Sequence, residues 1–507
     1  MLAPDYLDHA PDRLILLWQQ AEDDILRDVA RRIGKMGALT PTANWQLWRY
    51  QQTEAVRKDV VKLLARYTGK SEAEIRRLMQ EAATAALEAE DEIYYHYGKE
   101  PTPFEESTPL QNLLNAGYRQ TAGSFSNLTA TTANTVSGAF EQALDRVWLQ
   151  VSSGAFDYKT AVKRAVDGLA DSMPYVTYPS GHRDTLEVAC RRAVLTGVNQ
   201  TGAKLQEARM DEMGASFVEV TAHGGARPSH AVWQGRRYHR GGAVDYLGQH
   251  YEDFESATGY GTGAGLCGWN CRHTFFVVFP ELGSPPAWTQ ESLEALNARN
   301  IEYDSKLYTR YEISQMQRAR ERAVRKWKRR YLAEDAAGAD TTASAVKLRQ
   351  ARQSLADFTR ATGGRVDSAR TSVHGFGRSE GSKASYAARK QERFNAANTE
   401  LQQMREAGTI KAKGRLIESP SAPNEINFAS DHVLQRWAER GMGPMDAERI
   451  IRSSKVAMSQ RNGTQTCYYS ELGFVAIEQD GNVSSIGPLD EGGKKLMEVV
   501  KKHGIPH

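Results

Sequence analysis

The sequence predicts a multidomain α+β protein with a mostly helical N-terminal half, a small-sheet α+β domain in the middle and a small α+β C-terminal domain. Three observations carry this prediction. The length of 507 residues suggests about three domains. Apolar residues recur at spacings of three and four through most of the first 212 residues, as in amphipathic helices. Strand-like runs with Gly-rich turns follow only after residue 216 and again after residue 465.

The composition excludes several classes of protein. Hydrophobic residues make up 40% of the chain and charged residues 25%, which is ordinary for a globular protein. No apolar run approaches the roughly 20 residues that span a bilayer, so we expect no contact with a membrane. Four cysteines provide no disulfide framework, which favours a reducing compartment. The net charge of +3 argues against nucleic-acid binding over the whole surface.

Residues 1–138 form the first predicted segment, a helical region. Two helical stripes of apolar residues lie between residues 14 and 67. Ser71 and Glu74 have the spacing of a capping box, which predicts that a new helix begins there. The Thr-, Ser- and Asn-rich stretch 121–137 is interpreted as helix packed through small side chains.

Residues 139–285 are predicted as an α+β domain, with helices first and a small sheet after them. The clearest helix of the chain begins at Leu186 and ends at Met210. Residues 217–221 alternate like a strand, and residues 274–279 are a second strand candidate. The long Gly-, His- and Trp-rich loops between these strands indicate a functional site or a contact with a partner.

Residues 286–332 are predicted as a helical extension that contains a basic helix. Within it, residues 318–330 carry eight Arg or Lys and one Glu, a local charge of 8 − 1 = +7. Three interpretations stay open for this helix: contact with the phosphates of a nucleic acid, contact with an acidic protein surface, and a solvated helix face. The cations expected on its one face are Arg318, Arg322, Arg325 and Arg329.

The remaining chain is predicted as two segments. Residues 333–424 are interpreted as a linker, rich in Ala, Gly, Asp and Thr up to residue 345, followed by helices. Residues 425–507 are predicted as a small α+β domain. Its expected helices are Asp431–Arg440, Met445–Ser453 and Leu489–His503, and its expected strands are 466–469, 474–477 and 483–486.

A constellation of metal-ligating residue types lies in the middle domain. Cys267, Cys271, His273 and His230 supply sulfur and imidazole ligands for a tetrahedral zinc ion, although Cys-x3-Cys-x-His is not a standard zinc-finger spacing. The alternative is that the histidines hydrogen-bond to loop backbone and that Cys271 packs as a small buried apolar residue. We expect no cofactor unless this set binds zinc.

Two other chemistries are weaker alternatives at the same place. Residues 263–268 match G-x-G-x-x-G, but the residues that follow predict a strand instead of a helix, which argues against a dinucleotide site. Tight-loop geometry is the alternative reason for these glycines. Cys271 and His230 have the residue types of a nucleophile and its base, but nothing in the sequence shows that they meet.

Spaced blocks of this region resemble the phage minor capsid proteins of tailed phages and prophages, distant relatives of the phage Mu F-type head morphogenesis proteins. The resemblance covers about residues 5–335, and its blocks are Leu195–Thr201, His223–His230, Trp233–Gly235 and Gly265–His273. It implies a structural virion protein at the portal vertex, in the capsid interior, which assists head assembly or DNA delivery and passes through the host cytoplasm during assembly. The implied partners are the portal and the major capsid protein, with packaged DNA as a further contact. It implies no catalytic role for these loops, which are then a fold signature.

The C-terminal segment resembles a different family. His432, Arg436 and Arg440 recur every four residues, on one helix face, ahead of a small sheet. This arrangement is similar to the barnase/EndoU/RelE-like (BECR) nuclease domains. The resemblance implies a metal-independent ribonuclease in which His432 moves protons, Arg436 and Arg440 hold the phosphate, and Tyr468 or Arg461 assists. The alternative function is therefore a phage-delivered ribonuclease effector. Ten Lys or Arg against twelve Asp or Glu in residues 416–507 provide no field that attracts RNA.

Overall fold

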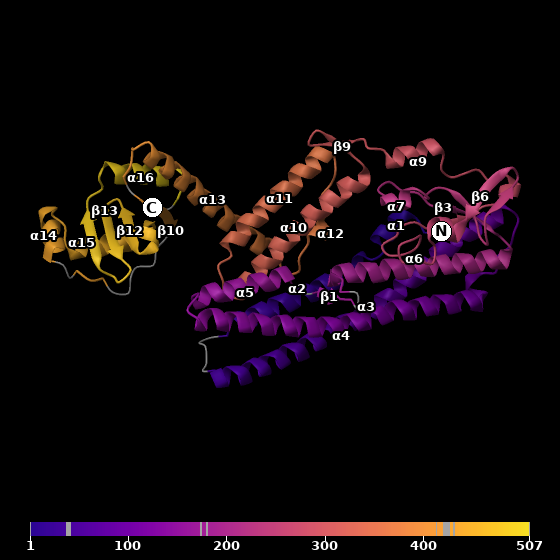
Figure 1. The fold of residues 1–507 in the computed structure, drawn as a ribbon, viewed down its shortest axis with the longest axis horizontal. Helices are drawn as coiled ribbons and strands as arrows, with labels where there is room; N and C mark the ends of the chain where they lie inside the picture. The colour runs from indigo at the N-terminus through magenta and orange to yellow at the C-terminus, as the bar shows by residue number, and fades with distance from the viewer. Residues whose placement is uncertain are drawn as a thin grey trace. The chain divides into compact units, whose positions relative to one another are not determined.

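The computed structural model describes residues 2–36, 42–172, 175–178, 181–411, 413–418, 426–428 and 431–505. The chain divides into two compact units, residues 1–380 (unit 1) and residues 381–507 (unit 2). Long helices dominate unit 1 and small sheets occur in both units, which confirms the predicted α+β class (Figure 1). In the described part of the chain, no helix has the length and apolar character needed to cross a membrane. The finer division into five segments stays a prediction.

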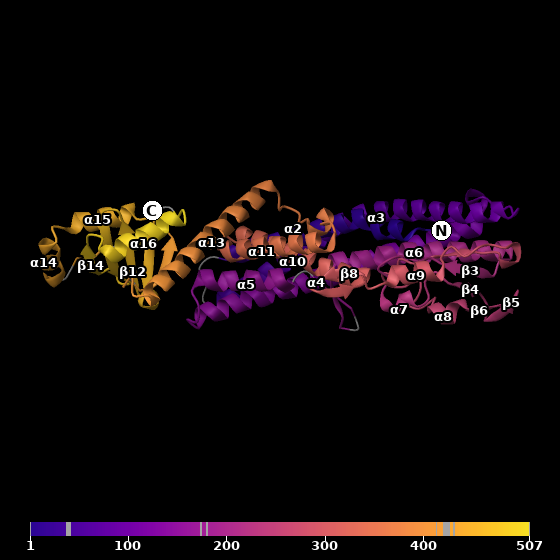
Figure 2. The same ribbon diagram turned by 90° about the horizontal axis from the view of Figure 1, so that it is seen from above.

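Unit 1 is built around three long helices, α3, α4 and α6, which lie side by side in both views (Figures 1 and 2). Helices α2 and α5 pack against this layer, α10 packs against α2 and α5, and α11 packs against α10. The helices of unit 1 are α1 (Pro4–His9), α2 (Asp12–Gly34), α3 (Thr42–His96), η1 (Phe104–Glu106), α4 (Thr108–Ser152), α5 (Tyr158–Ser172), α6 (Leu186–Met213), α7 (Pro228–Ala231), α8 (Phe254–Thr258), η2 (Pro280–Leu282), α9 (Gln290–Asn297), α10 (Arg310–Ala336), α11 (Thr342–Thr362) and α12 (Ser368–Thr371).

Helix α3 corrects one prediction about the N-terminal region. The helix runs without interruption through Ser71, so the predicted capping box there is wrong. The Ser71 hydroxyl donates to the Tyr67 carbonyl at 2.8 Å and accepts from Trp18 Nε1 at 2.9 Å, in the core. A serine that bonds back to the residue four positions earlier is compatible with a helix interior. The stretch 121–137 is helical, as predicted, and belongs to α4.

The predicted linker also differs from the structure. Helix α10 continues to Ala336 and α11 begins at Thr342, so most of residues 333–345 is helix. Ala333 near the end of α10 and Ala345 near the start of α11 are both buried. A Cβ on Gly34 would lie 2.3 Å from the carbonyl oxygen of Ala337, so α2 ends directly against this turn. The small residues therefore permit close packing of helices instead of forming a flexible linker.

A five-stranded sheet follows α6 in the middle of the chain, with strand order β5-β6-β4-β3-β7 and one parallel pair, β4 with β6. Its strands are β3 (Phe217–Val220), β4 (Arg237–His239), β5 (Val244–Tyr246), β6 (Gln249–Asp253) and β7 (Phe275–Val277). Strands β3 and β7 confirm the two predicted strands. The short pairs β1 (Tyr175–Thr177) with β2 (Arg183–Thr185) and β8 (Ile301–Tyr303) with β9 (Lys306–Tyr308) are hairpin-like additions.

Buried polar side chains dock this sheet onto the long helices. Glu90 of α3 accepts a hydrogen bond from the Val277 backbone N–H at 3.0 Å. Gln206 of α6 donates to the Phe275 carbonyl at 2.8 Å and to Glu90 at 3.0 Å. The Val277 N–H and the Phe275 carbonyl thereby find partners, as buried backbone groups at a sheet edge require.

Unit 2 is an antiparallel sheet of five strands between two pairs of helices. The strands, in both spatial and chain order, are β10 (Arg415–Glu418), β11 (Val456–Gln460), β12 (Gln465–Ser470), β13 (Gly473–Glu478) and β14 (Val483–Gly487), with η3 (Arg461–Gly463) between β11 and β12. Side chains packed with α13 (Arg378–Glu406) and α16 (Glu491–Lys502) form one core, and those packed with α14 (Asp431–Glu439) and α15 (Pro444–Ser453) form the other. The three predicted helices and three predicted strands are confirmed; β10 and β11 were not predicted.

Candidate functional site

Three of the four predicted zinc residues come together in the structure. His230 lies on α7, and Cys271 and His273 lie in the loop before β7; all three are buried. Cys271 Sγ lies 3.6 Å from His230 Nδ1 and 3.6 Å from His273 Nδ1. The three ligand atoms all lie within 4.8 Å of one another. The structure therefore shows that Cys271 and His230 meet, which the sequence did not.

Cys267, the fourth predicted ligand, does not join this cluster. Its Sγ lies 3.5 Å from the backbone carbonyl oxygen of His273. Its backbone has a φ of 57°, in the left-handed region, which turns the chain sharply between Cys267 and Cys271. His223 stacks on the His273 ring at 4.3 Å, and its Nδ1 donates to the Gly224 carbonyl. We name His230, Cys271 and His273 the His–Cys–His cluster.

The loop that carries Cys271 is held by close backbone contacts. Asn199 Nδ2 donates to the carbonyl oxygens of Cys271 and His273 at 3.0 Å each. A Cβ on Gly265 would lie 2.0 Å from the Gly259 carbonyl oxygen, so only glycine fits there. The residues after Gly268 lead into β7 and not into a helix. The glycines of the G-x-G-x-x-G match thus serve a tight loop, as the strand context predicted.

Hydrogen bonds orient both imidazole rings of the cluster. His230 Nε2 lies 2.9 Å from the Ala264 carbonyl oxygen, which can only accept. His273 Nε2 lies 3.0 Å from Gln234 Oε1, and this oxygen also accepts from the His223 backbone N–H. Nε2 is therefore the protonated nitrogen in each neutral ring, and each Nδ1 presents a lone pair to Cys271.

Burial controls the charges of the cluster. It lowers the pKa of His230 to about 4, and it lowers the pKa of His273 well below its ordinary value. It also raises the pKa of the Cys271 thiol. Without a bound cation, the neutral forms are favoured for all three groups. A neutral thiol beside neutral imidazoles is a poor nucleophile, which argues against the Cys–His hydrolase alternative.

A pocket of about 190 Å³ opens beside the cluster. All three cluster residues line it, together with Arg227, Arg272 and Arg318 among others. Burial and the neighbouring arginines lower the pKa of Arg318 to about 10. The wall of the pocket is thus cationic, and an anion or a polarised oxygen is the ligand that its electrostatics favour.

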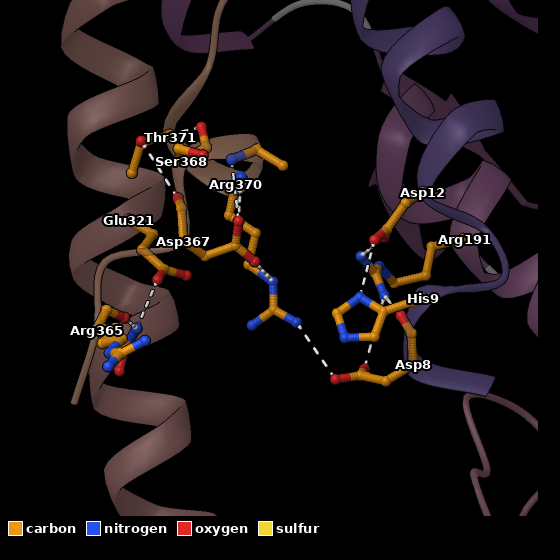
Figure 3. Close-up of polar contacts among 12 residues, drawn as sticks. Asp8, His9, Asp12, Arg191, Glu321, Arg365, Asp367, Ser368, Arg370 and Thr371 are labelled. Carbon is orange, nitrogen blue, oxygen red and sulfur yellow. Dashed lines mark hydrogen bonds and ion pairs between the residues drawn. The ribbon is translucent and has the colours of Figure 1, made fainter. Parts of the chain in front are cut away.

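Asp8 of α1 provides part of the compensating charge behind the pocket. Its carboxylate lies 3.5 Å from Arg272, 3.7 Å from Arg370 and 4.0 Å from Arg191. Figure 3 shows Arg370 and Arg191 directed at Asp8, from α12 and α6. Burial opposes the charged form, but the arginines hold the pKa of the Asp8 carboxyl below its usual value. Asp8 therefore pairs with one arginine of the pocket wall, Arg272, and with two arginines outside that wall.

The basic helix α10 does not present all of its predicted cations on an exposed face. Arg325 and Arg329 are buried, which argues against their contact with DNA or another anionic partner, and that contact stays a prediction. Arg329 lies 3.2 Å from Glu22 and 3.0 Å from Asp23, both buried on α2. Arg325 pairs with Glu187 of α6 and lies 3.8 Å from Glu22. These charges brace α10 against α2 and α6.

The other cations of α10 have mixed environments. Arg330 and Lys326 pair with Asp167 and Asp171 of α5. Arg318 lines the pocket, and Arg322 is exposed. Of the four predicted contact residues, Arg318 and Arg322 therefore remain candidates for contact with an anionic partner.

The predicted nuclease residues do not form a described catalytic cluster. Helix α14 is present, but the side chains of His432 and Arg436 lie outside the described residues. Arg440 donates to the Ile486 carbonyl at 2.6 Å. Tyr468 is buried among the apolar residues beneath α15, which argues against its predicted catalytic role, and that role stays a prediction. Arg461 pairs with Glu478 at 2.9 Å.

Sequence reasoning missed Gln234 and Asn199 as members of the site. Gln234 lies 39 residues from its partner His273, and Asn199 lies 72 residues from Cys271. No periodic pattern encodes contacts of that kind. Both residues fall inside blocks of the resemblance described above, Trp233–Gly235 and Leu195–Thr201, which was the available signal.

Comparison with known proteins identifies the family. Residues 2–360 match the family model described as Phage minor capsid protein 2. No curated protein and no solved structure matches the chain. The matched range contains the long helices, the central sheet, the His–Cys–His cluster and α10. The chain therefore belongs to the phage minor capsid protein 2 family, and it is a structural protein of the phage particle that interacts with other proteins of the head.

Proposed function

We propose that this protein acts at the portal vertex of a tailed-phage head, in few copies, where it assists head assembly or DNA delivery. The family match over residues 2–360 is the observation that carries the structural role. The buried ion pairs that connect α10 to α2 and α6 in unit 1 support this structural role. Such pairs resist rearrangement, since separating them leaves uncompensated charge in the interior.

An apolar surface on α3 and α4 supports attachment to another head protein. Leu47 and Tyr50 of α3 are 61% and 66% exposed, and Leu149 of α4 is 62% exposed. Trp45 and Trp148 stack with ring centroids 6.2 Å apart, which places these parts of the two helices together. Clustered exposed apolar side chains mark protein–protein contacts. We assign Leu47, Tyr50 and Leu149, the α3–α4 apolar surface, to contact with the portal protein.

Packaged DNA is a secondary partner in this proposal. Arg325 and Arg329 form ion pairs inside the protein. Arg322 is the exposed member of the predicted basic face. Attachment through phosphate contacts weakens steeply as salt rises, whereas attachment through an apolar surface does not. We therefore expect the protein to stay with heads that are washed at high salt.

The test compares assembled heads made with and without the portal protein. We expect the protein in the first and not in the second, measured by quantitative mass spectrometry of purified heads. Leu47→Asp combined with Leu149→Asp is expected to remove the protein from heads that contain portal. Leu282→Asp is the matched control, because Leu282 is exposed elsewhere, on η2. Retention in portal-free heads, or retention of the double variant, would contradict the proposal.

A ribonuclease in unit 2 is the alternative function. The sequence pattern of His432, Arg436 and Arg440 supports it, while the burial of Tyr468 argues against one of its expected groups. We place it second for that reason. Expression of the wild type and of His432→Ala is expected to leave cellular RNA equally intact on a gel. Degradation of RNA by the wild type but not by the variant would establish the alternative.

A further inference from the structure

We propose that His230, Cys271 and His273 bind a zinc ion whose fourth coordination position faces the arginine-lined pocket. The ligand atoms are His230 Nδ1, Cys271 Sγ and His273 Nδ1, which all lie within 4.8 Å of one another. Thiolate sulfur and imidazole nitrogen are the ligands that zinc prefers. The site comes from two segments, α7 and the loop before β7, so the ion would join them.

The distances from the Cys271 sulfur to the two imidazole nitrogens fit tetrahedral zinc. With Zn–S of about 2.3 Å and Zn–N of about 2.0–2.1 Å, a tetrahedral angle puts sulfur and nitrogen about 3.5–3.6 Å apart. Cys271 Sγ lies 3.6 Å from each Nδ1 atom. Both sulfur–nitrogen distances therefore match those of a tetrahedral zinc site.

The hydrogen bonds of the cluster leave one of the two Nδ1 lone pairs without a hydrogen-bond donor. Both Nε2 atoms donate, to Ala264 and to Gln234, so both Nδ1 atoms are acceptors directed at Cys271. A thiol has one proton and can serve one of these acceptors at a time. No other donor to either Nδ1 atom is found among the described residues. A cation bound to a Cys271 thiolate would satisfy both nitrogens.

The partners behind the rings are those of metal-binding histidines. Such histidines usually donate their second ring N–H to a carbonyl or carboxylate oxygen, which fixes tautomer and ring orientation. Ala264 serves His230 in this way, and Gln234 serves His273. Gln234 is itself fixed, since its Oε1 accepts from the His223 backbone and its Nε2 donates to Asn297 at 3.2 Å. The cluster is thus oriented in advance.

The pocket determines what completes the coordination. Three protein ligands leave one tetrahedral position, as in zinc sites that bind water or a substrate. The pocket reaches all three cluster residues and also carries Arg227, Arg272 and Arg318. These guanidinium groups favour a negatively charged oxygen, so the fourth ligand is a hydroxide or the oxyanion of a bound carboxylate or phosphate.

Metal analysis of the full-length protein tests the proposal. After purification with zinc and removal of free metal, we expect about one zinc per chain in the wild type and less than about 0.2 in Cys271→Ser. Cys267→Ser is the matched control, because Cys267 is also buried in this loop but its sulfur faces a carbonyl oxygen. It is expected to keep about one zinc per chain. Tryptophan fluorescence of each variant, compared with chelator-treated wild type, reports whether it is folded.

Cobalt substitution of the wild type provides a readout that does not depend on any variant. Co²⁺ added to chelator-treated protein is expected to give a thiolate-to-cobalt charge-transfer band and the intense visible bands of tetrahedral cobalt. Their absence would overturn the proposal, as would a wild type with less than about 0.2 zinc per chain. Full zinc retention by Cys271→Ser would also overturn it.

Discussion

Replacing Arg329 with methionine tests whether α10 is a structural brace. The Arg329 guanidinium lies 3.2 Å from Glu22 and 3.0 Å from Asp23. The Glu22 carboxylate is fully buried and that of Asp23 almost so. Methionine fills similar volume but leaves Glu22 with Arg325, and Asp23 with the weaker influence of Arg325 and Arg27. Removal of one partner from a buried ion pair lowers the free energy of unfolding by about 3–5 kcal/mol, and we expect Arg329→Met to lower it by that amount.

The loss is expected to depend on pH. Burial raises the pKa of Glu22 and of Asp23, and Arg329 opposes that rise. Without Arg329 both values rise further, so the folded state of the variant favours protonated carboxyls more strongly. For an acid with a raised pKa in the folded state, stability falls as pH rises. The difference between wild type and variant should therefore be larger at about pH 8 than at about pH 5.

Urea unfolding followed by tryptophan fluorescence measures this difference. Trp437 is the only tryptophan after residue 380, so the signal reports mainly on unit 1. Arg77→Met is the control, because Arg77 pairs with Glu74 and Glu81 on an exposed face of α3. The Arg77→Met substitution should lower the free energy of unfolding by at most about 1 kcal/mol. The reasoning is refuted if the Arg329 variant loses no more stability than this control, or if its loss is the same at both pH values.

Two glycine substitutions should have opposite effects on the same unfolding transition. Gly265→Ala would place a Cβ 2.0 Å from the Gly259 carbonyl oxygen, so we expect the loop to distort at a cost of about 1–3 kcal/mol. Gly138 lies in α4 with nothing within 4 Å of its added Cβ, and Gly138→Ala should stabilise by about 0.5–1 kcal/mol. Equal effects of the two substitutions, measured by urea unfolding, would contradict the packing described for the loop.

Local sequence patterns predicted helices and strands correctly where the apolar side chains of an element all face a single hydrophobic core. The helix from Leu186 and the strands β3, β7, β12, β13 and β14 are examples. The patterns failed where a side chain from a distant part of the chain hydrogen-bonds to a group that was expected to form a local hydrogen bond. Ser71 has the spacing of an N-cap, but Trp18, 53 residues away, occupies its hydroxyl. Tertiary contacts of this kind override local propensity.

The basic helix shows the same limit for charge. Residues 318–330 carry a local charge of +7, which left a contact with DNA, a contact with an acidic protein surface and a solvated face as open interpretations. The partners are inside the protein: Arg325 meets Glu187, 138 residues away, and Arg329 meets Glu22 and Asp23 on α2. The charges along one helix do not show which acidic residues of other helices pack against it.

The candidate metal site was predictable in residue types but not in geometry. Sulfur and imidazole ligands in one stretch of the sequence indicated Cys271, His273 and His230. The choice between Cys267 and Cys271 depended on the backbone, because Cys267 has a φ of 57° and its sulfur meets a carbonyl oxygen. The arginines that line the pocket come from separate segments that only the fold brings together.

The copy number of this protein in purified virions tests the central claim most directly. Quantitative mass spectrometry against the major capsid protein, with labelled reference peptides from both units, measures it. A structural protein of the portal vertex should be present in every mature particle at few copies. Absence from mature virions, or an amount that follows the major capsid protein one to one, would contradict the account.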